Sequence, residues 1–153
     1  MRIVVMSDSH RHEGNLFDIV EMHKEDADLF IFLGDGEDDI ENVEIMYSDL
    51  RFEIVAGNCD FCSTKPMYKE ISFAGKKIFF SHGHPFYVKH GYERIIEEAR
   101  SREADIVLFG HTHNQYTEYD GKLCIMNPGA VANGEYGMID IVNNQIMLLP
   151  CKM

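Results

Sequence analysis

The sequence predicts an α/β sandwich that holds at least one mixed β-sheet. The first half of the chain alternates continuous apolar runs with helical stretches, which is typical of parallel strands covered on both faces. The second half is richer in hairpin turns, which indicates antiparallel pairs. A length of 153 residues suits one domain, so we expect a single domain over residues 1–153.

The first half of the chain shows a strand–helix alternation. Three short apolar runs predict buried strands, and the two segments between them repeat their apolar residues at helical spacing. We expect strands at residues 3–6, 29–33 and 52–55, and helices at residues 13–25 and 39–48.

The second half combines hairpins with one clear helix. Tyr92, Ile95, Ile96 and Ala99 recur at helical spacing, and charged residues occupy the other positions of that segment. Two-residue turn sequences separate the apolar strands of the hairpins. We expect strands at residues 71–73, 77–80 and 106–109, and hairpin turns at Ala74-Gly75, Asp120-Gly121 and Asn143-Asn144.

Charge and composition exclude several classes of protein. Fourteen basic against 26 acidic residues give a net charge of −12, which disfavours long nucleic acid as a partner. No apolar run approaches the roughly 20 residues of a membrane helix, and the N-terminal residues are typical of a strand rather than an export signal. Four scattered cysteines form no disulfide framework. We therefore expect a cytoplasmic protein that does not bind membranes.

Polar side chains follow the predicted strands in a regular way. Five strands end at Asp, Asn or His, and Gly34, Gly57 and Gly110 precede such residues where the backbone must turn sharply. Ligands of open α/β sheets bind beyond the carboxyl ends of the strands, so we expect these side chains to meet at one edge. The set consists of Asp8, His10, Asp35, Asn58, His82, His111 and His113.

The chemistry of this set favours a metal centre. Imidazoles, carboxylates and an amide oxygen suit manganese, iron, zinc or cobalt more than calcium or magnesium. Seven ligands exceed one tetrahedral site but fit two ions that share a carboxylate. His111 and His113 are expected on an extended segment, where alternate side chains point the same way.

Each residue also has a structural interpretation when it is taken alone. Asp8 could cap a helix, Asp35 could belong to an ordinary turn, and Asn58 could accept a left-handed conformation. His82 could be a buried, hydrogen-bonded histidine. The coincidence of all seven at strand ends favours the metal centre.

These motifs resemble the calcineurin-like metallophosphoesterases, whose order they follow over residues 1–142. The small size and the elements Gly57-Asn58-Cys59-Asp60 and Asn127-Pro128-Gly129 resemble the compact YfcE-like phosphodiesterase branch. The resemblance implies a two-sheet sandwich flanked by helices, a four-layer αββα fold. The motifs are Asp8-Ser9-His10, Gly34-Asp35, Gly57-Asn58, His82 and Gly110-His111-Thr112-His113.

The resemblance also implies a mechanism and a set of ligands. A hydroxide that bridges two divalent ions would attack the phosphorus of a small phosphorylated substrate in line. Manganese is the first expectation for these ions, with iron, zinc, cobalt or nickel as alternatives. One ion would be held by Asp8, His10, Asp35 and His113, and the other by Asp35, Asn58, His82 and His111.

Four further residues are assigned to the site or depart from the family pattern. Arg11 stands where many members have glycine, and either binds a substrate phosphate or is an exposed residue at the helix start. His84 either supports the ligands or contacts the substrate. Cys59 replaces a histidine that acts as general acid in the protein-phosphatase branch, which predicts a preference for diesters or good leaving groups. Asp60 either orients its neighbours or caps the next turn. We therefore expect Asp35, Asn58, Cys59, Asp60 and His82 to act in catalysis.

Two functions outside this class stay open. A non-catalytic scaffold on the same fold, like the retromer-type subunits that resemble these enzymes, would recruit partners instead of turning over substrate. A thiol redox protein would use Cys59 and Cys62 and would keep its activity in the presence of chelators. A homodimer is also compatible with the sequence.

Overall fold

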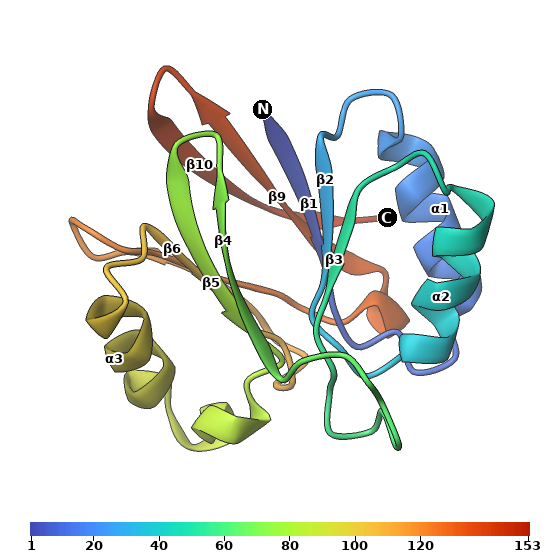
Figure 1. The fold of residues 1–153 in the computed structure, drawn as a ribbon, viewed down its shortest axis with the longest axis horizontal. Helices are drawn as coiled ribbons and strands as arrows, with labels where there is room; N and C mark the ends of the chain where they lie inside the picture. The colour runs from blue at the N-terminus through green and yellow to red at the C-terminus, as the bar shows by residue number, and fades with distance from the viewer.

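Two five-stranded sheets pack face to face in the computed structural model, which describes residues 1–153 (Figure 1). Two helices cover the outer face of the first sheet, and a third covers the outer face of the second sheet. The predicted four-layer αββα fold is confirmed. The helices are α1 (Glu13–His23), α2 (Glu37–Met46) and α3 (Glu93–Ser101), with short 3-10 turns η1 (His84–Phe86), η2 (Val88–His90) and η3 (Val131–Asn133).

The first sheet has the order β10-β9-β1-β2-β3 and is mixed. Its three N-terminal strands run parallel, while β9 pairs antiparallel with both β1 and β10. Asn143 and Asn144 form the two-residue turn between β9 and β10, as predicted, and both have positive φ. The strands are β1 (Arg2–Met6), β2 (Leu29–Phe32), β3 (Phe52–Ile54), β9 (Glu135–Val142) and β10 (Gln145–Lys152).

The second sheet has the order β4-β5-β6-β8-β7 and is also mixed. Its three central strands are parallel, and the two edge strands close hairpins. Ala74 and Gly75 connect β4 to β5, with Phe73 paired to Lys76 across the turn. The strands are β4 (Tyr68–Phe73), β5 (Lys76–Ser81), β6 (Ile106–Leu108), β7 (Gln115–Tyr119) and β8 (Cys124–Pro128).

Alternation along β1 explains why its apolar run is continuous. Ile3 and Val5 belong to the core between the two sheets, whereas Val4 and Met6 pack in the core beneath α1 and α2. Successive side chains of a strand point to opposite faces, so a strand covered on both sides needs apolar residues throughout. None of the helices is both long and apolar enough to cross a bilayer.

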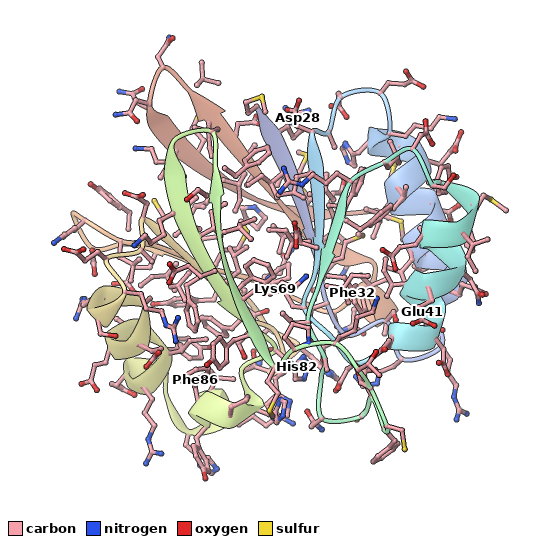
Figure 2. All side chains as sticks on the ribbon, in the orientation of Figure 1. Asp28, Phe32, Glu41, Lys69, His82 and Phe86 are labelled. Atoms are coloured by element: carbon pink, nitrogen blue, oxygen red, sulfur yellow. The ribbon has the colours of Figure 1, made fainter.

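The parallel strands of both sheets end at the same edge of the sandwich. In the first sheet these strands are β1, β2 and β3, and in the second they are β5, β6 and β8. Figure 2 shows the labelled His82 near the lower ends of β3 and β5. The prediction that five strand ends deliver polar residues to one region therefore matches the topology.

Candidate metal centre

Metal-ligating atoms form groups at this edge of the sandwich. Asp8, His10 and His113 make one group, and Asp35, His82 and His111 make another; within each group the ligand atoms lie within 4.8 Å of one another. Six of the seven residues expected from the sequence are thus brought together.

Asp35 belongs to the second group, and its carboxylate also faces the first group. Its Oδ2 is 3.3 Å from Nε2 of His82 in one group and 3.7 Å from Nε2 of His10 in the other. Its Oδ1 accepts a hydrogen bond of 2.8 Å from the backbone N–H of Cys59. One carboxylate oxygen is therefore fixed by the backbone, and the other faces imidazoles from both groups, as a shared ligand requires.

Asp8 provides the clearest test of whether a cation fits here. Its Oδ2 accepts hydrogen bonds from the Ser7 hydroxyl at 2.5 Å and from the backbone N–H of His111 at 3.0 Å. Its Oδ1 is buried and accepts no hydrogen bond, although Nε2 of His113 lies 3.0 Å away. A buried carboxylate oxygen without a donor costs free energy, and a divalent ion at this position would satisfy it.

His82 is oriented by the main chain. Its side chain is buried, and Nδ1 lies 2.8 Å from the carbonyl oxygen of Leu33, to which it donates. In the neutral ring the lone pair is then on Nε2, which lies 3.1 Å from Nδ1 of His111. Histidine ligands of metals are held in this way, with one ring nitrogen bonded to a carbonyl or carboxylate and the other free.

Burial and mutual contacts set the charges of these groups. Burial alone raises the pKa of Asp35, but contacts with His82 and the Cys59 N–H outweigh it and hold that pKa well below its usual range. Burial alone lowers the pKa of His82, but contacts with Asp35 and Asp8 outweigh it and raise that pKa. Burial and the nearby His82 lower the pKa of His111 to about 4. His111 is therefore neutral at pH 7, the state in which imidazole binds a metal.

Left-handed backbone conformations concentrate at the ligand groups. Non-glycine residues seldom adopt them, and each costs up to about 1–3 kcal/mol, so they persist where the surrounding structure enforces them. Five of the candidate ligands have a positive φ, namely Asp8, His10, Asp35, His111 and His113.

The segment of His111 and His113 differs from the sequence prediction. Both residues have left-handed φ values, of 68° and 57°, so the segment is bent rather than extended. Their side chains consequently join different ligand groups instead of pointing the same way. The division between two groups agrees with the ligand assignment that the family resemblance implies.

The glycines before the ligands serve two different purposes. Gly34 has a φ of +100°, as the predicted sharp turn requires. Gly57 and Gly110 have no positive φ, so the predicted reason is wrong for them. A Cβ on Gly57 would lie 2.1 Å from Oδ1 of Asp35, and one on Gly110 would lie 2.0 Å from the Ser7 hydroxyl. These two glycines therefore allow their backbones to approach the Asp35 carboxylate and the Ser7 hydroxyl closely.

Asp60 binds main-chain groups and not the ligand side chains. Its carboxylate accepts backbone N–H bonds from Asp35, Gly36 and Glu37 at 2.8–2.9 Å, and from Gly57 at 2.7 Å. Asp60 therefore orients neighbouring groups, which is one of its two expected roles. The helix end that it caps is the start of α2, and not the turn that follows Asp60 in the sequence. These contacts favour a positioning role for Asp60, and its part in catalysis stays a prediction.

Two neighbouring residues of the predicted catalytic set, Asn58 and Cys59, differ in their contacts with Asp35. Asn58 is exposed, and its amide reaches only Sγ of Cys59, at 3.5 Å, so no contact places it in either ligand group. Sγ of Cys59 lies within 4.8 Å of ligand atoms of His10 and Asp35. Burial and the Asp35 carboxylate raise the pKa of the Cys59 thiol.

The two predicted substrate contacts flank the ligand groups. The backbone N–H of Arg11 donates to Asp39 at 2.9 Å, while its exposed guanidinium makes no ion pair. The ring of His84 lies 5.5 Å from that of His82, centroid to centroid, and its Nδ1 is buried without a hydrogen-bond partner.

Asn127 is a supporting residue that sequence reasoning did not assign to the site. It is buried, and its amide donates to the Gly110 carbonyl and the Thr112 hydroxyl at 3.0 Å each. Its oxygen accepts the N–H of Gly129. Asn127 therefore holds the segment that carries His111 and His113. The available signal was the element Asn127-Pro128-Gly129 of the family resemblance, which the structure places at the end of β8, parallel to β6.

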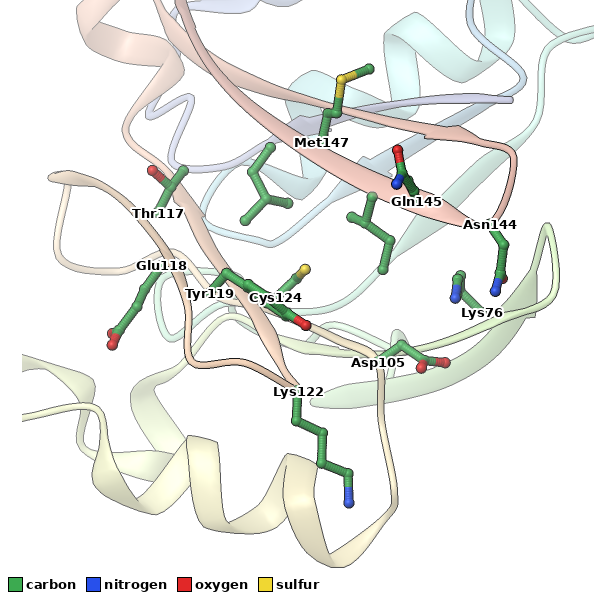
Figure 3. Close-up of a pocket in the computed structure, with 12 residues that line it drawn as sticks. Lys76, Asp105, Thr117, Glu118, Tyr119, Lys122, Cys124, Asn144, Gln145 and Met147 are labelled. Atoms are coloured by element: carbon green, nitrogen blue, oxygen red, sulfur yellow. The ribbon is translucent and has the colours of Figure 1, made fainter.

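Two cavities differ in their relation to these groups. One, of about 540 Å³, is lined by His10, Asp35, Arg11 and Cys59 and therefore opens on the ligand groups. A larger one, of about 630 Å³, lies between the β7–β8 hairpin and β10, with Tyr119 and Met147 in its lining (Figure 3). The larger cavity includes residues just before β6 and is thus at the opposite end of the parallel strands.

The chain is similar to several known proteins. The family model described as the calcineurin-like phosphoesterase superfamily domain matches residues 1–143. The chain is 33% identical over 133 residues to a probable metallophosphoesterase, YsnB of Bacillus subtilis, covering 86% of this chain and 75% of that protein. It is 29% identical over 147 residues to the phosphodiesterase MJ0936 of Methanocaldococcus jannaschii, covering 84% and 83% of the two chains.

A solved structure of a differently named protein shares the fold. Vps29 of Chaetomium thermophilum superposes with a TM-score of 0.75, covering 100% of this chain and 97% of that one. The sequence identity is 15%, so this likeness concerns the fold alone.

Proposed function

Since this chain belongs to the calcineurin-like phosphoesterase superfamily and is a metal-dependent hydrolase of phosphoester bonds, we propose that it uses two divalent ions to cleave phosphodiesters. The observation that carries the proposal is the position of Asp35, which faces imidazoles from two ligand groups. A single-ion site would not need a carboxylate between two such groups.

The proposed ligands divide between the two ions, and one carboxylate is shared. Asp8, His10 and His113 would bind one ion and His82 and His111 the other, with Asp35 shared; Asn58, which follows β3 at the same edge, stays a predicted ligand. Bound ions of this type supply a hydroxide nucleophile near neutral pH, placed for in-line attack, and neutralise charge on the phosphoryl oxygens. Manganese is our first choice of metal.

Substrate size and charge follow from the cavity beside these groups. Its volume of about 540 Å³ suits a small molecule. Arg11 offers an unpaired guanidinium to a phosphate, and a net charge of −12 disfavours long nucleic acid. A small phosphorylated substrate is therefore favoured.

The decisive experiment is hydrolysis of bis(p-nitrophenyl) phosphate by the purified protein with added Mn²⁺. We expect turnover that EDTA abolishes, and no turnover by Asp35→Asn, which removes the shared carboxylate. Asp49→Asn is the matched control, because Asp49 is exposed, lies outside this cavity and has a side chain that forms no hydrogen bond or ion pair. Full activity of Asp35→Asn would contradict the proposal.

The same assay separates the two alternatives. A non-catalytic scaffold would bind Mn²⁺ without turnover with any divalent ion; the presence of all the expected ligands argues against it. A thiol redox protein would keep its activity in EDTA and lose it in Cys62→Ser.

A further inference from the structure

We propose that the loop after β3 recognises an aromatic group of the substrate through the ring of Phe61. The inference rests on the proposed phosphodiesterase function and adds a substrate class to it. The class is a phosphodiester with a single negative charge and one planar aromatic substituent of about nucleobase size.

Phe61 is an unusual residue for a surface position. Its side chain is 87% exposed, more than that of any other large apolar or aromatic residue. Other exposed rings have partners: the Tyr87 ring lies under the Arg94 guanidinium, and the Tyr119 hydroxyl donates to the Gly121 carbonyl. Phe61 packs on no other ring and no cation. Its ring is therefore available to a ligand.

Hydrogen bonds fix the two residues that precede Phe61 in its loop. The preceding residue, Asp60, accepts four backbone N–H bonds, three of them from the start of α2. One residue earlier, the Cys59 N–H donates to Asp35. A ring attached to such an anchored backbone loses little further freedom when a ligand binds, which favours recognition.

The cavity of about 540 Å³ connects this ring to the ligand groups. Phe61 lines it together with His10 and Asp35, and Arg11 contributes the free guanidinium. A phosphoryl group held at His10, Asp35 and Arg11 would leave its ester substituent within the same cavity, where the face of Phe61 offers an aromatic surface.

Charge in the cavity limits the substrate to one phosphate. Glu37 and Asp38 also line it, and neither side chain has a cationic partner. A second phosphate beside these carboxylates would be repelled, whereas a neutral ring would not. A nucleobase-like group therefore fits the cavity better than a nucleoside polyphosphate does.

A pair of phosphonate esters tests the aromatic contact without relying on turnover. Methyl phenylphosphonate and methyl cyclohexylphosphonate have the same charge and similar size, but only the first is aromatic. We expect calorimetry on the Mn²⁺-loaded protein to show the phenyl compound binding about three- to tenfold more tightly. Phe61→Leu should bring this ratio close to one, and Phe61→Tyr should restore it.

The control is Tyr119→Leu, which changes an exposed aromatic residue of the other cavity and should leave the ratio unchanged. Equal binding of the two compounds to the wild-type protein, no binding of either, or a ratio that survives Phe61→Leu would overturn the inference. If the ratio behaves as expected but bis(p-nitrophenyl) phosphate is not hydrolysed, the proposed function fails while the aromatic site stands.

Discussion

The backbone N–H of Asp35 donates a hydrogen bond of 2.9 Å to the carboxylate of Asp60, 25 positions further along the chain. Because Asp60 binds three further backbone N–H groups, it joins the turn after β2 to the turn after β3. The shared carboxylate of the proposed metal centre is thus placed by a residue that contacts none of the other ligands.

Asp60→Asn should weaken both the fold and the metal centre, since an amide group cannot accept all four bonds. We expect the free energy of unfolding to fall by about 1–3 kcal/mol and Mn²⁺ affinity to fall by about 10–100-fold. Urea unfolding and Mn²⁺ titration measure the two effects. Asp49→Asn, at an exposed position outside the cavity, should change neither. Unchanged Mn²⁺ affinity in Asp60→Asn would refute the positioning role.

Asn127→Ala should release the segment that carries His111 and His113. The substitution removes the donor to the Gly110 carbonyl and the Thr112 hydroxyl and leaves the buried N–H of Gly129 without its acceptor, which costs about 1–3 kcal/mol. We also expect weaker Mn²⁺ binding, measured by titration. Asn114→Ala is the control, because Asn114 is exposed and its amide bonds only to the Thr112 carbonyl. Equal effects of the two substitutions would contradict the role given to Asn127.

Removal of metal should abolish activity without unfolding the protein, because the apolar core between the sheets contains none of the proposed ligands and a domain of this size needs no metal to fold. Adding Mn²⁺ to 100 times its dissociation constant should stabilise the fold by about 2.7 kcal/mol for each site. Asp8→Asn should show much less of this Mn²⁺-dependent stabilisation, because Oδ1 of Asp8 is buried without a hydrogen-bond donor and would bind the ion. Differential urea unfolding with Mn²⁺ and with EDTA measures the effect. Unfolding on chelation alone would show that the expectation is wrong.

Cys59→His should raise activity on poor leaving groups more than on good ones. The thiol is a weak general acid, and burial with the Asp35 carboxylate raises its pKa further. Histidine titrates near neutrality and could protonate an alkoxide. Steady-state rates on aryl and alkyl phosphodiesters test this prediction. A uniform change across leaving groups would argue against an acid role at this position.

Asp120 should contribute an acid-sensitive part of the stability. Its carboxylate accepts the backbone N–H of Leu123 at 2.7 Å, the guanidinium of Arg100 at 2.6 Å and the backbone N–H of Lys122 at 2.9 Å, which lower the pKa of Asp120 to about 2. The folded state favours the ionised form, so this stabilisation is complete above about pH 4 and is lost as the pH falls through about 2.

Asp120→Asn should therefore lower the free energy of unfolding at pH 7 by about 1 kcal/mol, a modest value because the residue is exposed. Near pH 2, where the Asp120 carboxylate is about half protonated, the difference should fall well below its value at pH 7. Urea unfolding at pH 7, 4 and 2 provides the measurement, and a pH-independent difference would count against the assignment.

Local patterns predicted most of the elements and their ends. The turns at Ala74-Gly75 and Asn143-Asn144 appear where expected, because two-residue turns depend on the residues that form them. Helix ends were less well predicted: α1 ends at His23 rather than residue 25, and α2 begins at Glu37 rather than residue 39. The start of α2 depends on Asp60, a residue distant in sequence.

The sequence by itself determined the set of candidate ligands, because the residues that follow buried strands can be identified from short apolar runs. Only the tertiary structure decided how they are grouped. His111 and His113 separate into different groups because their segment bends, and the His111 N–H reaches Asp8 across 103 positions. Such contacts arise when two sheets pack and bring distant turns together, so no local pattern of residues encodes them.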